Sequence, residues 1–185
     1  MDLFLINFKK EKNNAENKKL QSEISKILSE KLLDIFYKTN TTLEHNIDGS
    51  PYFKNSDINI SISHTENIIA LLFSKNKSGV DIEYMKERNF KKVLKRYSIN
   101  SNTGKTEFYQ LWTDFEARYK GLDVKTKSFI YKNSVCSYCI TGEEINVFEI
   151  TLKDNNFKDI NEIKKCTAIK EIDDLKNRIK FVKNR

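Results

Sequence analysis

Hydrophobic and polar residues follow two different periods along this chain, and each period is typical of a different element. Strict alternation or a short apolar run predicts a strand, whereas apolar residues three and four positions apart predict an amphipathic helix. The predicted strands cover residues 2–8, 57–64, 67–73 and 78–84, with two or three more within 128–152. The predicted helices cover 16–38, 88–97 and 106–121, with another in the tail through Ile172, Leu175, Ile179 and Val182.

Strands and helices are mixed along the chain without a regular strand–helix–strand repeat, which favours an α+β fold. Residues 74–78 form a short polar segment between two predicted strands, so we expect a hairpin there. The length of 185 residues suits one compact domain, or two small halves that share a core.

The chain is basic, with a formal net charge of +7, which favours an acidic partner. It begins with a short apolar run followed by lysines, the reverse of a secretory signal peptide, and no apolar run is long enough to span a membrane. We therefore expect a cytoplasmic protein without a membrane partner. Acidic residues are interspersed through the basic tail, which has no recognised nucleic-acid motif. This pattern favours a solvated helix and no nucleic-acid partner.

The three cysteines, an odd number, are expected to be free thiols. Cys136 and Cys139 form a C-x-x-C pair, but Cys166 and two histidines lie at no usual zinc spacing. Residues three apart in a strand also face opposite sides. We expect neither a metal site nor a redox site in this pair.

Asp81 and Glu83 are two residues apart in a predicted strand and therefore share one face, opposite Val80 and Ile82. One interpretation is a strand whose polar face lies in water. The other is a hard-cation site, because Mg²⁺ prefers carboxylate oxygens and keeps further positions for water or phosphate. The spacing leaves both interpretations open.

The helix predicted at 106–121 has an apolar stripe at helical spacing. Its members are Phe108, Leu111, Trp112, Phe115 and Tyr119. Glu116 and Lys120 lie one turn apart along the edge of this stripe. They suit either an ordinary surface pair, or a carboxylate at a cleft wall followed by a phosphate-binding lysine. Ser63 and His64 lie where a predicted strand enters a turn, a common place for binding residues, although a single histidine is more often structural.

Four motifs follow one another in a characteristic order: GSPYF (49–53), SISHT (61–65), GVDIE (79–83) and FYQLWTDFEARYK (108–120). Their order resembles that of the larger, pseudo-dimeric 4'-phosphopantetheinyl transferases, whose pattern is roughly G-x-P, S-x-S-H, G-[IV]-D-x-E and [FW]-[ST]-x-K-E-[AS]-x-x-K. The resemblance implies two similar α+β halves with pseudo-twofold symmetry. The N-terminal half, residues 1–75, would be short, and residues 76–185 would form the C-terminal half with a basic helical tail.

The resemblance also implies an activity and a metal ion. The protein would transfer 4'-phosphopantetheine from coenzyme A to a serine of an apo acyl or peptidyl carrier protein, releasing 3',5'-ADP. Asp81, Glu83 and Glu116 would hold Mg²⁺, and Glu116 would also take the proton of the carrier serine. We expect a monomer that acts on this carrier protein.

Further roles implied by the resemblance concern the phosphates of coenzyme A. Lys120 would steady the leaving 3',5'-ADP, and Ser63 and His64 would contact the phosphates. Lys18 or Lys19 would replace part of the family's basic clamp for the 3'-phosphate.

The sequence departs from the family pattern at two lysines. Phe115 stands where the family has the lysine before the catalytic glutamate, and Ser50 replaces the lysine of the G-K-P motif in many members. We expect Phe115 to pack within the apolar stripe. These departures motivate an alternative function, that of a catalytically weak or inactive relative that binds coenzyme A or a carrier protein.

Overall fold

The computed structural model describes residues 1–90, 92, 104–122, 125–155, 163–166 and 169–172. The helical elements are α1 (Asn14–Tyr37), α3 (Lys105–Lys120) and the short 3-10 turn η1 (Lys153–Asn155). The strands are β1 (Asp2–Asn7), β2 (Leu43–His45), β3 (Pro51–Phe53), β4 (Asn59–Thr65), β5 (Ile68–Ser74), β6 (Val80–Tyr84), β7 (Thr126–Tyr131), β8 (Ser134–Cys139), β9 (Asn146–Thr151), β10 (Ile163–Lys165) and β11 (Lys170–Ile172).

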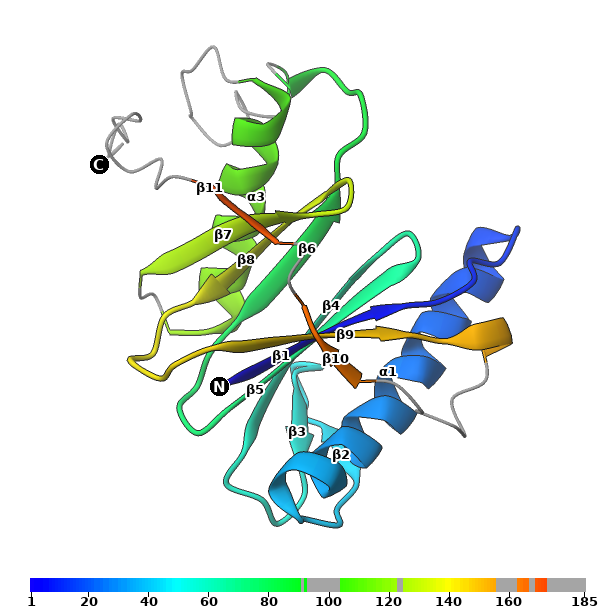
Figure 1. Cartoon of the computed structure of the whole chain (residues 1–185), viewed down its shortest axis with the longest axis vertical. Helices are drawn as coiled ribbons and strands as arrows, with labels where there is room; N and C mark the ends of the chain where they lie inside the picture. Colours follow the sequence, from blue (N-terminus) through cyan, green and yellow to red (C-terminus); the bar gives the residue numbers. More distant parts are fainter. Residues whose placement is uncertain (91, 93–103, 123–124, 156–162, 167–168, 173–185) are drawn as a thin grey trace.

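Two sheets lie face to face, and a helix covers the outer face of each (Figure 1). The larger sheet has the strand order β10-β9-β1-β5-β4, with α1 on its outer face, and only β1 and β9 are parallel among its described strands. The smaller, antiparallel sheet has the order β11-β7-β8-β6, with α3 on its outer face. A ribbon of β2 and β3 completes the fold. This arrangement confirms the α+β class.

The alternation of side chains along β1 explains the layers. Phe4 and Ile6 belong to the core under α1, whereas Leu3 and Leu5 belong to the core between the two sheets. The apolar side of α1 completes the first core with Ile24, Leu28, Leu32 and Leu33. The neighbouring strand β5 is apolar at almost every position because both of its faces are buried.

The larger sheet combines strands from distant parts of the sequence. β9 and β10, which follow residue 76, extend a sheet whose other strands precede residue 75. The ranges 1–75 and 76–185 therefore share one sheet, and the division of the chain between them stays a prediction. None of the described helices is long and apolar enough to cross a membrane.

Two predicted elements take a different form. Ile172, assigned to the tail helix, instead ends β11 and lies opposite Ser128 of β7. The assignment was wrong because the free edge of β7 is a tertiary feature that local periodicity does not reveal. The rest of the tail helix lies outside the described residues, as does most of the helix predicted at 88–97.

The hairpin predicted at residues 74–78 is also wrong. β5 pairs with β1 and β4 in the larger sheet, whereas β6 pairs with β8 in the smaller one. The segment therefore crosses from one layer to the other. The physical reason is that Val80 and Ile82 are buried against the face of the larger sheet, which leaves β6 in the opposite layer.

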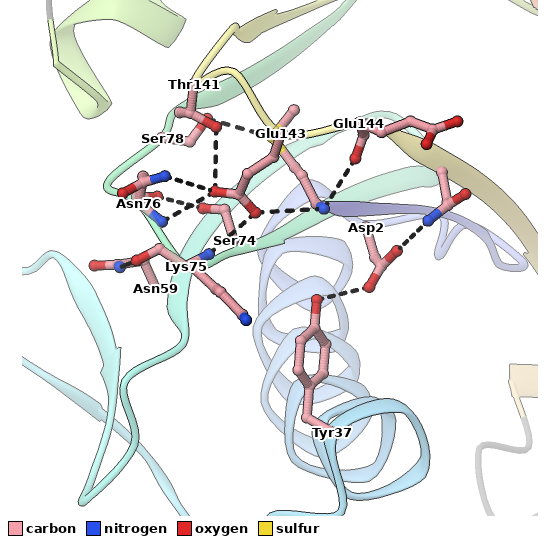
Figure 2. A network of polar contacts seen from close by, with 12 residues as sticks. Asp2, Tyr37, Asn59, Ser74, Lys75, Asn76, Ser78, Thr141, Glu143 and Glu144 are labelled. Carbon is pink, nitrogen blue, oxygen red and sulfur yellow. Dashed lines mark hydrogen bonds and ion pairs between the residues drawn. The ribbon is translucent and has the colours of Figure 1, made fainter.

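Glu143, in the loop between β8 and β9, holds this crossing segment in place (Figure 2). Its carboxylate accepts hydrogen bonds from the backbone N–H groups of Lys75 and Asn76, at 3.3 and 3.1 Å, and from Asn76 Nδ2 at 3.1 Å. At the end of the segment, the hydroxyl of Ser78 donates to the carbonyl of Cys139 at 3.1 Å. These contacts determine where β6 begins, and hence where its two acidic residues lie.

Candidate functional site

The C-terminal end of α3 packs directly on the start of β6, because glycines occupy both contact points. A Cβ atom on Gly79 would lie 1.9 Å from the carbonyl oxygen of Ala117, and one on Gly121 would lie 2.7 Å from the nitrogen of Gly79. A glycine permits this approach because it has no Cβ. The contact brings Lys120 over β6, where its Nζ lies 2.7 Å from Asp81 Oδ1.

The buried side of α3 differs from the predicted apolar stripe. Its buried residues are Phe108, Tyr109, Gln110, Thr113 and Ala117. Phe115 and Tyr119 are instead 55% and 82% exposed, so their assignment to the buried stripe was wrong. The physical reason is that α3 lies close to a row of small side chains, in which Ser137 lies 2.7 Å from the hydroxyl of Thr113. Phe108 and Tyr109 are still buried in the first turns of α3, whereas the later buried positions, closest to these small side chains, are Thr113 and Ala117.

Asp81 lies beneath α3 rather than in water. Asp81 and Glu83 share a face as predicted, but only 8% of the Asp81 side chain is exposed, so the solvated interpretation is wrong for this residue. Its Oδ1 accepts hydrogen bonds from Ser63 Oγ at 2.8 Å and from Lys120 Nζ at 2.7 Å. Its Oδ2 is buried and has no hydrogen-bond partner in the described part of the chain. An unpaired buried carboxylate oxygen is unfavourable unless a ligand satisfies it.

Glu83 is held in an environment that disfavours its charge. Desolvation is the first cause and the neighbouring Asp81 charge the second, and together they raise the pKa of Glu83 to about 7. Three cations reduce the effect: Arg88, Lys120 and Lys86. A bound cation would stabilise these two carboxylates, because it would offset both their desolvation and their mutual repulsion.

The raised pKa of Glu83 predicts a pH-dependent stability. Because the pKa in the folded state lies above the ordinary value of 4.5, folding favours the protonated form. The stability that this preference contributes is fully present below about pH 4.5, and it is lost as the pH rises through about 7 and Glu83 becomes charged. The uncharged Glu83→Gln variant should therefore be more stable than the wild type at pH 8 by about 1–2 kcal/mol, after allowance for solvent screening. The difference should disappear near pH 5.

Urea denaturation at both pH values would measure this difference, with the fluorescence of Trp112, the single tryptophan, as the signal. Glu144→Gln, which changes an exposed side chain, is the control and should change little at either pH. An equal stability difference for Glu83→Gln at pH 5 and pH 8 would contradict the assignment.

His64 and Ser63 are adjacent on β4 but have different environments. His64 is exposed, yet nearby protein displaces enough water to lower its pKa, and the charges of Lys120 and Lys18 add to this effect. Ser63 is buried, and its hydroxyl donates its single proton to Asp81. The predicted contact of Ser63 with a phosphate would require that proton to be redirected.

The first turns of α1 are attached to the turn between β4 and β5. The side-chain amides of Asn17 and Gln21 both donate to the carbonyl of Glu66, each at 3.0 Å. This attachment explains why Lys18 is close enough to His64 to affect its pKa. Lys19 lies on the exposed side of α1, and its side chain makes no hydrogen bond or ion pair with the other described residues.

Glu116 lies on α3, one turn before Lys120, and is half-buried. Its carboxylate makes no hydrogen bond or ion pair with the described residues and is therefore available to a ligand. Within the same residues, no group of three or more His, Cys, Asp or Glu side chains is arranged to hold a metal ion. The structure thus brings Asp81, Glu83 and Lys120 together. Glu116 lies one helical turn before Lys120 on α3.

The three cysteines are buried, and none forms a disulfide within the described residues, in line with the prediction of thiols. Cys136 packs in the core between the sheets, whereas Cys139 donates to the carbonyl of Ala117 on α3 at 3.3 Å. The two members of the C-x-x-C pair therefore lie on opposite sides of β8.

Sequence reasoning missed the two glycines as packing residues and the buried hydroxyls as structural links. The signals available were the single glycine before the acidic strand and the polar residues at alternate positions of 57–64. Neither signal identifies the contacting element, because that element is distant in sequence. No protein-family model matches this chain, and no curated protein matches it either.

Proposed function

We propose that this protein transfers the 4'-phosphopantetheine group from coenzyme A to a serine of an apo acyl or peptidyl carrier protein, in a Mg²⁺-dependent reaction. The proposal includes two similar halves related by pseudo-twofold symmetry. The presence of one helix on the outer face of each sheet supports that arrangement. The formal net charge of +7 supports electrostatic attraction of an acidic carrier protein.

The observation that best supports the proposal is the pair Asp81 and Glu83. One has a buried oxygen without a partner among the described residues and the other has a pKa raised to about 7, and such a pair suits a divalent cation with oxygen ligands. Asp81 and Glu83 would hold Mg²⁺, with Glu116 as the third carboxylate. When bound, the metal ion would neutralise charge on the coenzyme A pyrophosphate.

Glu116 is proposed as the proton acceptor. The carrier serine oxygen forms a bond to the β-phosphorus of coenzyme A while the bond from that phosphorus to the bridging oxygen breaks. The leaving 3',5'-ADP takes the electron pair of the broken bond, and the serine proton passes to Glu116. Most of the catalysis in such a transfer comes from positioning and charge stabilisation.

Cationic and polar groups beside the carboxylates would bind the phosphates. Lys120 would steady the departing 3',5'-ADP, and its present position over β6 places its charge beside Asp81. His64, whose pKa is lowered, is neutral near pH 7 and would donate one N–H to a phosphate oxygen. Lys18 would add a positive charge on the α1 side.

A transfer assay tests the proposal. The protein would be incubated with coenzyme A, Mg²⁺ and a panel of purified apo acyl and peptidyl carrier proteins, followed by intact-protein mass spectrometry. We expect one carrier to gain the mass of one phosphopantetheine group, and we expect EDTA to prevent the gain. The absence of a gain on every carrier at stoichiometric protein concentration would contradict the proposal.

Glu116→Gln should reduce the transfer rate by about a hundredfold, a typical effect of removing a general base. Glu107→Gln is the matched control, because it makes the same chemical change on the same helix. Glutamine can keep the hydrogen bond that Glu107 accepts from the Gly104 N–H at 3.0 Å. Wild-type activity in Glu116→Gln would reject this residue as the base.

A catalytically weak relative that binds coenzyme A is the second candidate. Two residues favour this second candidate, because each stands where the family pattern has a lysine and neither supplies a cation at the site. Phe115 is largely exposed, and the Ser50 hydroxyl is bonded within its own loop to Asp48 and Asn46, at 2.6 and 2.9 Å. Calorimetry would distinguish the candidates: metal-independent binding of coenzyme A, together with no transfer, favours the second.

A further inference from the structure

A row of hydroxyl groups joins the two sheets beside the candidate site. β4 and β6 lie next to each other in different sheets, and the β6 backbone donates to β4 side chains instead of to a β4 backbone. Ser61 accepts from the Val80 N–H at 3.0 Å, Ser63 from the Ile82 N–H at 3.2 Å, and Thr65 from the Tyr84 N–H at 3.0 Å. All three hydroxyls therefore have the same structural role as acceptors between the layers.

Ser63 differs from the other two because its proton goes to a carboxylate. Its Oγ donates to Asp81 Oδ1 at 2.8 Å, and Lys120 Nζ donates to the same oxygen at 2.7 Å. One oxygen of Asp81 thus receives both donors, while Oδ2 receives none from the described residues. Because Oδ1 accepts one hydrogen bond from β4 and one from α3, the orientation of the Asp81 carboxylate is fixed.

We infer that Ser63 is a positioning residue, which holds Asp81 so that Oδ2 remains available to a divalent cation. The inference rests on the proposed cation site, and it assigns Ser63 a role other than contact with a phosphate. Hydrogen bonds to a ligating carboxylate orient it, and their loss typically reduces metal affinity by about 10- to 100-fold. Without the Ser63 hydroxyl, the Asp81 side chain could rotate and offer both of its oxygens to Lys120.

Ser61 is a close matched control. Both serines are buried on the same strand face, and each accepts one backbone N–H from β6. Ser61→Ala and Ser63→Ala should therefore lose similar stability, about 1–3 kcal/mol for a buried N–H left without an acceptor. Only Ser63→Ala also removes a donor from Asp81. Ser63→Thr retains the hydroxyl, and Thr65 shows that a threonine fits this row.

The test measures direct binding of Mn²⁺, used in place of Mg²⁺, to the full chain without coenzyme A. The electron paramagnetic resonance signal of free Mn²⁺ gives the bound fraction. We expect Ser63→Ala to bind at least about tenfold more weakly than the wild type. Ser61→Ala and Ser63→Thr should remain within about threefold of it. Circular dichroism would confirm that each variant is folded at the temperature of the titration.

Each outcome identifies which idea fails. Equal Mn²⁺ affinities for Ser63→Ala and Ser61→Ala would overturn the positioning role while leaving the cation site intact. The absence of Mn²⁺ binding by the wild type would overturn both. A Ser63→Thr variant as weak as Ser63→Ala would also overturn the inference, because the hydroxyl would then not be the group that matters.

Discussion

Replacement of Gly79 by alanine is expected to reduce the free energy of unfolding by about 3 kcal/mol or more. The added Cβ would lie 1.9 Å from the carbonyl oxygen of Ala117 and 2.7 Å from the nitrogen of Gly121. Overpacking against side chains typically costs about 1–3 kcal/mol. The atoms here belong to the backbone, so α3 would have to move away from β6, and relaxation by a rotamer change is not available.

Urea denaturation followed by Trp112 fluorescence would measure this loss, because the single tryptophan lies on the helix that must move. Gly104→Ala is the control. The nearest atom to its added Cβ would be 3.9 Å away, at the end of the flexible Glu107 side chain. Its cost should stay below about 1 kcal/mol, the range for a glycine at a helix N-cap. Equal stabilities of the two variants would refute the close contact.

Replacement of Asp81 by asparagine is expected to reduce phosphopantetheine transfer by about a thousandfold. The substitution preserves side-chain size but removes the buried charge that would hold Mg²⁺, and a metal ion can supply several kcal/mol of transition-state stabilisation. It also removes the charge that pairs with Lys120 at 2.7 Å. The lysine would then lose the partner that holds it over β6.

Asp2→Asn is the matched control for this substitution. Asp2 is also an aspartate on a strand that accepts two hydrogen bonds, from Tyr37 at 2.6 Å and from Asn146 at 2.9 Å, and Figure 2 shows it in the network around Glu143. It has no contact with Asp81 or Lys120. The initial transfer rate should stay within about threefold of wild type for Asp2→Asn, as expected for a residue outside the site. Wild-type transfer by Asp81→Asn would contradict the proposed cation site.

The elements of this fold could be predicted largely from local sequence. The period of two in β1 and β4 and the period near four in α1 each report a buried face, and the structure has these elements at the expected places. Local period does not report which element covers that face. For this reason the hairpin at 74–78 and the buried position of Phe115 were both predicted incorrectly.

The candidate site, too, was predictable from local sequence only in part. The sequence by itself determined that Asp81 and Glu83 share a face, because strand geometry alternates side chains. It also determined that Glu116 and Lys120 share a face one helical turn apart.

Only the tertiary structure decided that this strand face is covered by a helix. Gly79 and Gly121 let α3 approach β6 closely enough for Lys120 to reach Asp81, and burial then raises the pKa of Glu83 to about 7. Both effects depend on distances between segments far apart in the chain. The spacing of residues along a sequence contains no such distances, so an acidic strand in water and a buried carboxylate pair look alike until the helix is in place.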